Sequence, residues 1–576
     1  MSEPGQLVAE QVVEVVGCGD DPVLWDVHAG VEVGEVEFGF AGVPDNQLAQ
    51  SAAAVDFEAD AGFGPFGWRL AQGCGQAGGG ELVAVIGVPL LEPRQGRGEV
   101  WVSWLVMWPV WSACRWAWRR PPRDHQRFVE TISDSVAAAA ASVDVAGWVE
   151  EFACGFARIA GRFKRREPRL QARSFLLGVL SDVDTRSCWQ LAEQSGDASP
   201  RAMQRLLGEA VWDADAVRDD VRGYVIDAIG DPDGVLILDD TGDLKAGVHT
   251  VGVQRQYTGT AGRIENAQVS VFLAYASPAG RALIDRAVYL PVSWTNDPGR
   301  CAAAGIPDDI GFATKITLGR RMLERALDAG VPAAWASADE FYGGDRGLRR
   351  DLQGRHLGYV LAVAKSHQVN IGGLHGTARG DYIAATLSKR AWNRYSAGDG
   401  AKGRREYDWA WVAVMPPADE ATGFHWLLIR RRIRDGELAF YRCYNPTRVA
   451  LPTLVRVAGT RWAVECCFQN AKGAVGLDQH QVRRWESWHR YTTLVMLAAA
   501  ILTVIAATAR RQALQPGLIP LTVNEIRRLF AKLITTRTRP VAFSLAWSRW
   551  RRIHQARARA SHYRTHGHID HRPSST

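Results

Sequence analysis

The run TTLVMLAAAILTVIAATA, Thr492 to Ala509, constrains the fold most, because eighteen uncharged residues must be kept away from water. That length is at the lower limit for a helix that spans a bilayer. The run is rich in Ala and Thr, which favours the alternative, a helix buried inside a large domain. The chain has 576 residues, enough for two to four domains with a full core. We therefore expect a buried central helix and no membrane partner.

The charge of the chain is unevenly distributed. It has 68 Lys and Arg against 62 Asp and Glu, a formal excess of +6. From Arg537 to the C-terminus there are nine Arg, five His and a single acid, Asp570. A basic segment of this kind is either a solvated tail or a segment that contacts phosphates.

The cysteine pattern indicates reduced thiols. Nine Cys are scattered without a CxxC pair, and the only close neighbours are Cys466 and Cys467. Adjacent residues of a helix point apart, so neither a disulfide framework nor a zinc site is expected. We therefore expect a cytoplasmic protein.

The sequence changes character at several points, and we divide it there. The segments are 1–126, read as a disordered extension or as DNA upstream of the true start codon; 127–230, helical and a candidate DNA-binding domain; 231–365, α/β; 366–452, a β-rich insertion; 453–534, helical; and 535–576, a basic C-terminal tail. GCGQAGGG in the first segment precedes a strand-like run instead of following one, so it is not a dinucleotide-binding loop.

The helical segment contains SCWQLAEQSGDASPRAMQRLLGEA, which predicts a helix, a short turn and a second helix. A helix-turn-helix of this kind could bind DNA, although most such helix pairs are simply packed in bundles.

The segment 231–365 predicts three strands, a helix, a strand, a helix and a strand. GVLILDDTG, QVSVFLAYAS and RALIDRAVYLP are the first three strands. This element order is that of a ribonuclease-H-like fold. We therefore expect an α/β catalytic domain of this type with a β-rich insertion, preceded by a helical domain.

Acidic residues follow the predicted strands of this segment. Asp239 and Asp240 end the first strand, Asp339 ends a later one, and Glu465 lies on a helix after the insertion. Strand-end carboxylates converge on one edge of an open sheet, and crowded acids resist ionisation unless a divalent cation neutralises them. Oxygen ligands suit Mg²⁺ or Mn²⁺, and two such ions can support phosphodiester cleavage. The alternative, that each Asp is a turn former, does not explain their order.

A second pattern surrounds Glu465. In RWAVECCFQNAKG, Arg461, Glu465 and Lys472 are separated by four and eleven residues, so the three charges share one helix face. Such a face could hold one acid between two phosphate-binding cations. The alternative is a solvated helix with an Arg–Glu pair.

The runs LDDTG, GTAGRIENAQVSVFLAYAS, SADEFYGGD and RWAVECCFQNAKGAVGLD together resemble the DDE-superfamily transposases of bacterial insertion sequences, in the branch with the Y-R-E-K signature. The similarity covers roughly residues 145–533. It implies that Asp240, which immediately precedes a Thr, forms a catalytic and metal-binding triad with Asp339 and Glu465.

The signature also implies that Arg461 and Lys472 grip DNA phosphates beside the catalytic acid. One departure is plain, since the signature's Tyr would stand at position 458, which is Ala458. Other candidates for contact with DNA are Lys315 and Arg263. Three tryptophans of the insertion are candidates for stacking on a flipped base: Trp409, Trp411 and Trp426. Alternating tryptophans, as in WAW, are also typical of packing within a strand.

The resemblance predicts a cut-and-paste transposase of the bacterial cytoplasm, associated with the nucleoid. Two Mg²⁺ or Mn²⁺ ions would assist nicking at the element ends, and the freed 3′-hydroxyl would attack target DNA. Because two ends must be held together, a homodimer on double-stranded DNA is expected. The alternatives are a decayed or domesticated DNA-binding protein, which does not cut, and a ribonuclease-H-like nuclease, which never joins.

Deletion of residues 1–126 is predicted to leave DNA binding and cleavage intact, because all the motifs lie after this segment. Binding and nicking by the shortened chain measure this. A shortened protein that folds but no longer binds DNA would contradict it.

Overall fold

The computed structural model describes residues 143–372, 376–400, 403–512 and 519–565, and of the residues before these only five strands. The chain divides into two compact units, Met1–Val143 and Asp144–Thr576. The strands of the first unit form an antiparallel three-stranded sheet and a separate pair: β1 (Ala9–Val15), β2 (Val23–Glu32) and β3 (Glu35–Phe40), then β4 (Leu90–Leu91) and β5 (Val102–Ser103). Most of residues 1–126, and the interpretation given to them, lie outside the described residues.

The second unit begins with five helices, as the pattern of 127–230 predicts: α4 (Val145–Ala160), α5 (Arg166–Leu180), α6 (Cys188–Ser195), α7 (Arg201–Gly208) and α8 (Ala214–Ile229). The predicted helix-turn-helix is the pair α6 and α7. Ser187 caps α6 by accepting from the backbone N–H of Gln190, and Gly196 ends it in the left-handed conformation, at φ 90°. A Cβ disfavours this conformation, so glycine suits the turn between the two helices.

The predicted α/β segment forms the centre of a large sheet. Its strands are β6 (Val235–Leu244), β7 (Gln254–Thr258), β8 (Arg263–Ala276), β9 (Arg281–Val288), β10 (Trp335–Ala338) and β11 (Gly358–Val363). The order β9-β8-β6-β10-β11, antiparallel on one side of β6 and parallel on the other, confirms the ribonuclease-H-like fold. The hairpin strand β7, which adds to β8, was not predicted. The helices of this segment are α9 (Val292–Thr295), α10 (Pro298–Ala304), α11 (Lys315–Asp328), α12 (Glu340–Gly343) and α13 (Arg346–Gly354).

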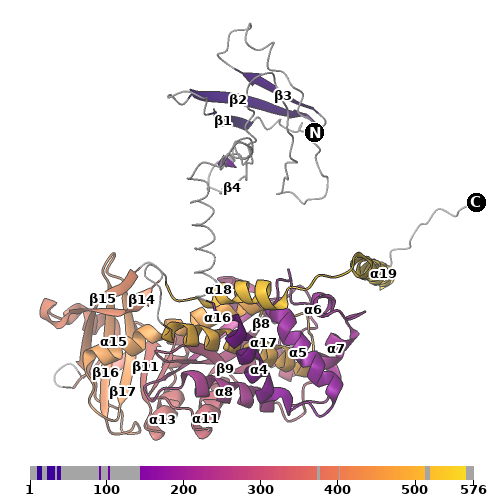
Figure 1. Cartoon of the computed structure of the whole chain (residues 1–576). Coiled ribbons are helices and arrows are strands. Elements are labelled where there is room, and N and C mark those ends of the chain that lie inside the picture. Colours follow the sequence, from indigo (N-terminus) through magenta and orange to yellow (C-terminus); the bar gives the residue numbers. More distant parts are fainter. Residues whose placement is uncertain are drawn as a thin grey trace, which may run out of the picture. The chain divides into compact units, whose positions relative to one another are not determined.

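The insertion is β-rich, as predicted, but it continues the central sheet. Its elements are β12 (Gln368–Asn370), β13 (Thr377–Arg379), α14 (Gly380–Thr386), the short helix η2 (Lys389–Ala391), β14 (Asn393–Gly400), β15 (Gly403–Ala413), β16 (Phe424–Arg432) and β17 (Leu438–Asn445). Strand β17 pairs with β11, so β14 to β17 extend the sheet to ten strands. These strands lie at one end of the second unit and α5 to α7 at the other (Figure 1).

The remaining elements are α15 (Leu451–Thr460), α16 (Trp462–Val475), α17 (Trp485–Arg511), α18 (Val523–Phe530), η3 (Ala531–Thr535) and α19 (Val541–Thr565). Among the described residues, α17 is the helix long and apolar enough to cross a membrane, yet 83% of its apolar window is buried inside the protein. It packs against α4, α5, α7, α8, α16, α18 and β9. The predicted buried helix is therefore confirmed.

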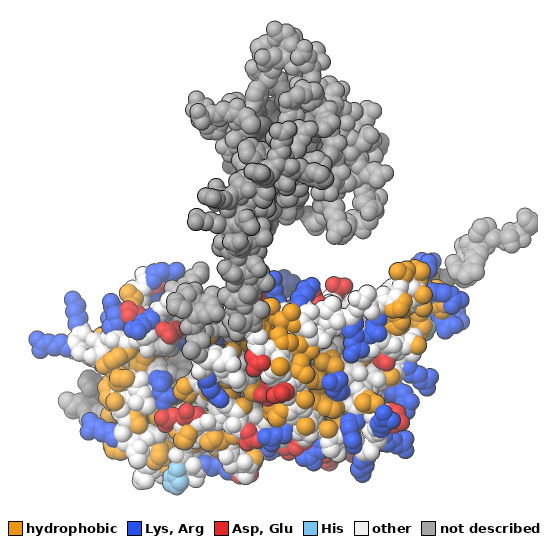
Figure 2. Space-filling model, viewed as in Figure 1, with side chains coloured by type: hydrophobic (Ala, Val, Ile, Leu, Met, Phe, Trp, Pro, Cys, Tyr) orange, Lys and Arg blue, Asp and Glu red, His pale blue; other side chains and the backbone are white. Residues whose placement is uncertain are grey.

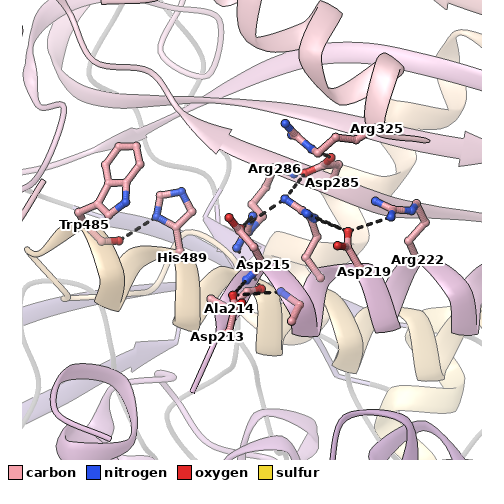
Figure 3. A network of polar contacts seen from close by, with 12 residues as sticks. Asp213, Ala214, Asp215, Asp219, Arg222, Asp285, Arg286, Arg325, Trp485 and His489 are labelled. Atoms are coloured by element: carbon pink, nitrogen blue, oxygen red, sulfur yellow. Dashed lines mark hydrogen bonds and ion pairs between the residues drawn. The ribbon is translucent and has the colours of Figure 1, made fainter. Parts of the chain in front are cut away.

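An ionic network around two buried residues of the edge strand β9 joins this strand to the helices (Figure 3). Asp285 and Arg286 are consecutive on β9 and point to opposite faces of the sheet. Asp285 is fully buried and lies 3.0 Å from Arg325 of α11 and 3.7 Å from Arg218 of α8. On the other face, Arg286 donates to Asp215 of α8 at 2.7 Å.

Helix α17 reaches the same network through His489. Burial, together with the nearby Arg286, lowers the pKa of His489 to about 3, so this imidazole is neutral at physiological pH.

Substitution Asp285→Asn is expected to lower the free energy of unfolding by about 3–5 kcal/mol, because it removes the fully buried negative charge that Arg218 and Arg325 share. Urea denaturation measures this. The control is Asp351→Asn at the Arg320–Asp351 pair, whose side chains are 38% and 48% exposed. An exposed pair contributes at most about 1 kcal/mol. Equal losses in the two variants would contradict the role given to the network at β9.

Candidate active site at one edge of the sheet

Asp239 and Asp240 were expected to end their strand, but they lie in the middle of β6, just after its parallel pairing with β10 ends at Leu238, because β6 continues along β8 to Leu244. The two acids point to opposite faces of the sheet, because successive strand residues alternate. Asp239 faces α16, where Arg461 approaches it at 3.5 Å. Its cross-strand partner Phe272 also faces α16 and meets Phe468 there, with ring centroids 5.5 Å apart.

Asp240 faces α11 on the other side. Both of its carboxylate oxygens accept hydrogen bonds from Lys315, each at 3.0 Å. The hydroxyl of Tyr342 donates to Asp240 at 3.1 Å. Asp240 is therefore held by a cation and a phenol on the face opposite to α16, the helix that carries Glu465.

Asp339 follows β10, the parallel neighbour of β6. Its carboxylate caps α12 by accepting from the backbone N–H groups of Phe341, at 3.0 Å, and Tyr342, at 3.3 Å. The cap fixes one carboxylate oxygen at the sheet edge beside the acids of β6.

Glu465 lies in the first turn of α16, and its side chain is 42% exposed. Arg461, at the junction of α15 and α16, lies 3.5 Å from Asp239 and 4.0 Å from Glu465. Its guanidinium therefore sits between an acid of the sheet and the acid of the helix. The predicted pairing of Arg461 with Glu465 on one helix face is present, and the structure adds Asp239 as a third member.

The electrostatics support this grouping. Burial and repulsion from Asp339 raise the pKa of Asp239 to about 7, Arg461 opposes the rise, and Glu465 adds to it. Burial also raises the pKa of Asp339, with a contribution from Asp240. Charged acids crowded at one buried edge are costly without a compensating cation.

Lys472 lies further along α16, on the face that meets β6. Its ammonium is 3.3 Å from Asp243 and donates to the carbonyl oxygen of Gly242 at 3.2 Å. Asp243 also lies 3.5 Å from the buried His480. Lys472 thus has an acidic partner within the protein, and sequence reasoning did not identify Asp243.

The tryptophans predicted to stack on a flipped base are largely buried, whereas other aromatic residues near the acids are exposed. Trp409 is 1% and Trp426 6% exposed, so both pack within the sheet, and Trp411 stacks on Trp426 with ring centroids 5.5 Å apart. Two aromatic residues beside the acids are instead exposed: Trp462, at 54%, and Phe341, at 49%. Sequence reasoning missed both, although Trp462 directly follows Arg461 and Phe341 stands two residues after Asp339.

Three further residues named from the sequence differ in their surroundings. Ala458, at the place of the signature's Tyr, is buried in α15. Arg263 pairs with Glu265 at 2.8 Å and stays exposed. Lys315, besides its bond to Asp240, lies over the ring of Phe341 at 4.3 Å.

The donor set fits a divalent cation in its chemistry. No three His, Cys, Asp or Glu side chains of the described part of the chain stand close enough to ligate one ion. Asp239, Asp339 and Glu465 nevertheless present oxygen donors to one region, where burial and mutual repulsion raise the pKa values of the two aspartates despite the nearby Arg461. Glu465 is half exposed, so a change of rotamer can redirect its carboxylate.

Substitution Asp239→Asn is expected to raise the free energy of unfolding at pH 8. The folded pKa of about 7 exceeds the unfolded value of about 3.9, so the folded wild type binds more protons between these values and loses stability as pH rises. The gain should shrink as pH falls through about 7 toward 4. Urea denaturation in EDTA at pH 5 and pH 8 measures it.

The matched control is Asp240→Asn, which loses the ion pair with Lys315 and is expected to be less stable than the wild type at pH 8. Should Asp239→Asn be no more stable than the wild type at pH 8, the charge crowding inferred at this edge would be refuted.

Comparisons with known proteins bear on this site. Residues 158–377 match the family model of the DDE superfamily endonucleases, a stretch that includes Asp239, Asp240 and Asp339. A probable transposase for insertion sequence element IS701 from Microchaete diplosiphon is 23% identical over 198 residues, which cover 34% of this chain and 49% of that protein. The chain thus spans about half the length of this curated relative.

A cryo-EM structure of a piggyBac transposase synaptic complex with hairpin DNA matches with a TM-score of 0.37 and 10% identity, over 67% of this chain and 76% of that one. The fold assignment rests on the strand order given above. Residues 158–377 are therefore similar to the DDE superfamily endonucleases, and part of the chain is similar to a curated transposase.

Proposed function

We propose that this chain is a transposase that cleaves DNA at the ends of an insertion sequence and joins the freed 3′ end to target DNA. The observation that carries the proposal is the grouping of Asp239, Asp339 and Glu465 on the α16 face of one sheet edge, with Arg461 between two of them. Acids collected at a buried edge are unfavourable for stability, so their presence indicates chemistry.

In this proposal Asp239, Asp339 and Glu465 hold Mg²⁺ or Mn²⁺, up to two ions. When bound, the ions would activate a water and stabilise the leaving oxygen of a phosphodiester. Asp239 replaces Asp240, which the sequence resemblance favours, because Asp240 faces α11 and is held by Lys315.

The remaining residues position the substrate. The guanidinium of Arg461 lies beside Asp239, and its side chain is 23% exposed. We propose that it binds a phosphate oxygen next to the cleaved bond. Lys472 is less suited to this role because Asp243 neutralises it, and we assign it to fixing α16 on β6. Lys315 and Tyr342 orient the middle of β6 by holding Asp240.

The reaction has two steps of the same kind. In the first, water attacks the phosphorus at the element end, and the bond to the 3′ oxygen breaks to leave a 3′-hydroxyl. In the second, that hydroxyl attacks a phosphodiester of target DNA, and a 3′ oxygen of the target leaves. One site suffices for both, because each is an in-line displacement at a phosphodiester.

The helical segment is the proposed DNA-binding part, as the sequence analysis expects. On α7, Arg201, Gln204 and Arg205 are exposed while Met203 and Leu206 are buried, so this helix offers a polar basic face. Joining requires two ends to be held together, so we also propose a homodimer on double-stranded DNA. We also propose that the protein acts in the bacterial cytoplasm, at the nucleoid.

The test uses purified protein and DNA that carries the sequences flanking its gene. Nicks at the ends are expected with Mg²⁺ and not with EDTA, and Asp239→Asn and Glu465→Gln are expected to abolish them because each removes a proposed ligand. Asp240→Asn is the matched control. It removes an orienting contact, and we expect nicking to fall about 10–100-fold.

The reverse pattern, with nicking retained in Asp239→Asn and lost in Asp240→Asn, would return the catalytic role to Asp240. Binding without cleavage, equal in wild type and Glu465→Gln, would favour a decayed end-binding protein. Nicks without joined products would favour a nuclease.

A further inference from the structure

The exposed arginines of α19 form a basic surface outside the candidate active site. This helix of 25 residues contains six Arg and no Asp or Glu. Figure 2 shows blue side chains gathered on it. A basic tail that packs against nothing is ordinarily only solvated. A role in binding therefore requires that the helix pack against the rest of the protein.

The first half of α19 is anchored to α6 and to the turn between α6 and α7. Trp547 is 2% exposed, and its indole N–H donates to the carbonyl oxygen of Asp197 in that turn at 2.9 Å. Trp550 meets Trp189 of α6 edge to face, with ring centroids 4.8 Å apart. A buried tryptophan with a satisfied N–H is a strong anchor, so α19 is packed onto the helix pair.

Anchoring leaves the opposite face of α19 open. At 100° per residue, Arg549, Arg552 and Arg559 lie within about 80° of one another and away from Trp547. All three are exposed, and within the described ranges none has an acidic partner at ion-pair distance. Arg551, which lies on the packed side, does have one, Glu193.

We propose that Arg549, Arg552 and Arg559 bind the phosphate backbone of duplex DNA beside the α6–α7 helix pair. The inference rests on the proposed function, since DNA is the substrate there. The three side chains extend along about 15 Å of helix, and each guanidinium can donate to a phosphate through two N–H groups. The bond from Trp547 fixes α19 to the turn that precedes α7, the helix on which Arg201 and Arg205 are exposed.

A second copy of the chain fits this face less well. Two such faces would bring six arginines together without an acid on either side, and like charges repel. Two aliphatic residues are exposed at the beginning of α19, Val541 at 75% and Leu545 at 64%. Self-association through those two residues is the rival use of α19, and the experiment separates it.

The test measures binding of a labelled duplex of about 40 base pairs from the flanking ends, between 50 and 300 mM NaCl. In the triple variant Arg549→Gln, Arg552→Gln, Arg559→Gln, we expect the slope of log affinity against log salt to become shallower by about 2.7, from about 0.9 per phosphate contact. Gln keeps helix propensity, and circular dichroism checks the fold. If the triple variant fails to fold, each single variant should lower the slope by about 0.9.

The matched control removes two exposed arginines of α13 and the exposed arginine that follows this helix, all of which already have acidic partners: Arg346→Gln, Arg350→Gln and Arg355→Gln. It changes the net charge equally and should keep the wild-type slope. The corresponding Arg→Lys triple on α19 should also keep it, because the charge is retained. An unchanged slope in the Gln variant, or an equal drop in the control, overturns the proposal.

Sedimentation of the same variants, and of Val541→Ser with Leu545→Ser, completes the test. If the Gln triple dissociates the protein without changing the salt slope, α19 serves self-association and the proposal fails. Nicking is scored separately. A wild type that binds with a steep slope but never nicks contradicts the proposed function alone, whereas nicking with an unchanged slope in the variant contradicts only this inference.

Discussion

Burial of helix α17 is the constraint on which the second unit depends. An apolar helix of 27 residues can be kept from water only if other elements surround it. They come from both sides in sequence: α4, α5, α7 and α8 precede the sheet, while α16 and α18 follow the insertion. The helical segment and the catalytic sheet therefore share one core, although the sequence suggests boundaries near residues 230 and 453.

This shared core also explains the charges that it encloses. Where α8, α17 and β9 meet, Asp285 and Arg286 are buried, and each is paired with an oppositely charged side chain that is itself partly exposed, Arg325 and Asp215 (Figure 3). The network ties both faces of the sheet edge to neighbouring helices. Asp239, in the middle of β6, differs, because burial and the nearby Asp339 raise its pKa although Arg461 lies beside it. This difference in electrostatics distinguishes the candidate site from the network at β9.

Much of the catalytic fold could be predicted because its signals are local. Apolar runs bounded by turns gave the strands β6, β8 and β9, and helical periodicity gave α11 and α13. Strand pairing between distant segments has no such signal. The antiparallel pairing of β17 with β11 makes the insertion part of the central sheet, and only the structure shows it. The sequence indicated four acids at the site but could not orient the two that are adjacent.

The sequence by itself determined the kinds of elements, the buried helix and the residues from which a site could be built, because these follow from periodicity and composition. Only the tertiary structure decided which of those residues meet. Asp239 and Asp240 are chemically identical neighbours, and a strand turns alternate side chains to opposite faces. The packing of α16 on one face and α11 on the other therefore joins Asp239 to Arg461 and the region of Glu465, and Asp240 to Lys315.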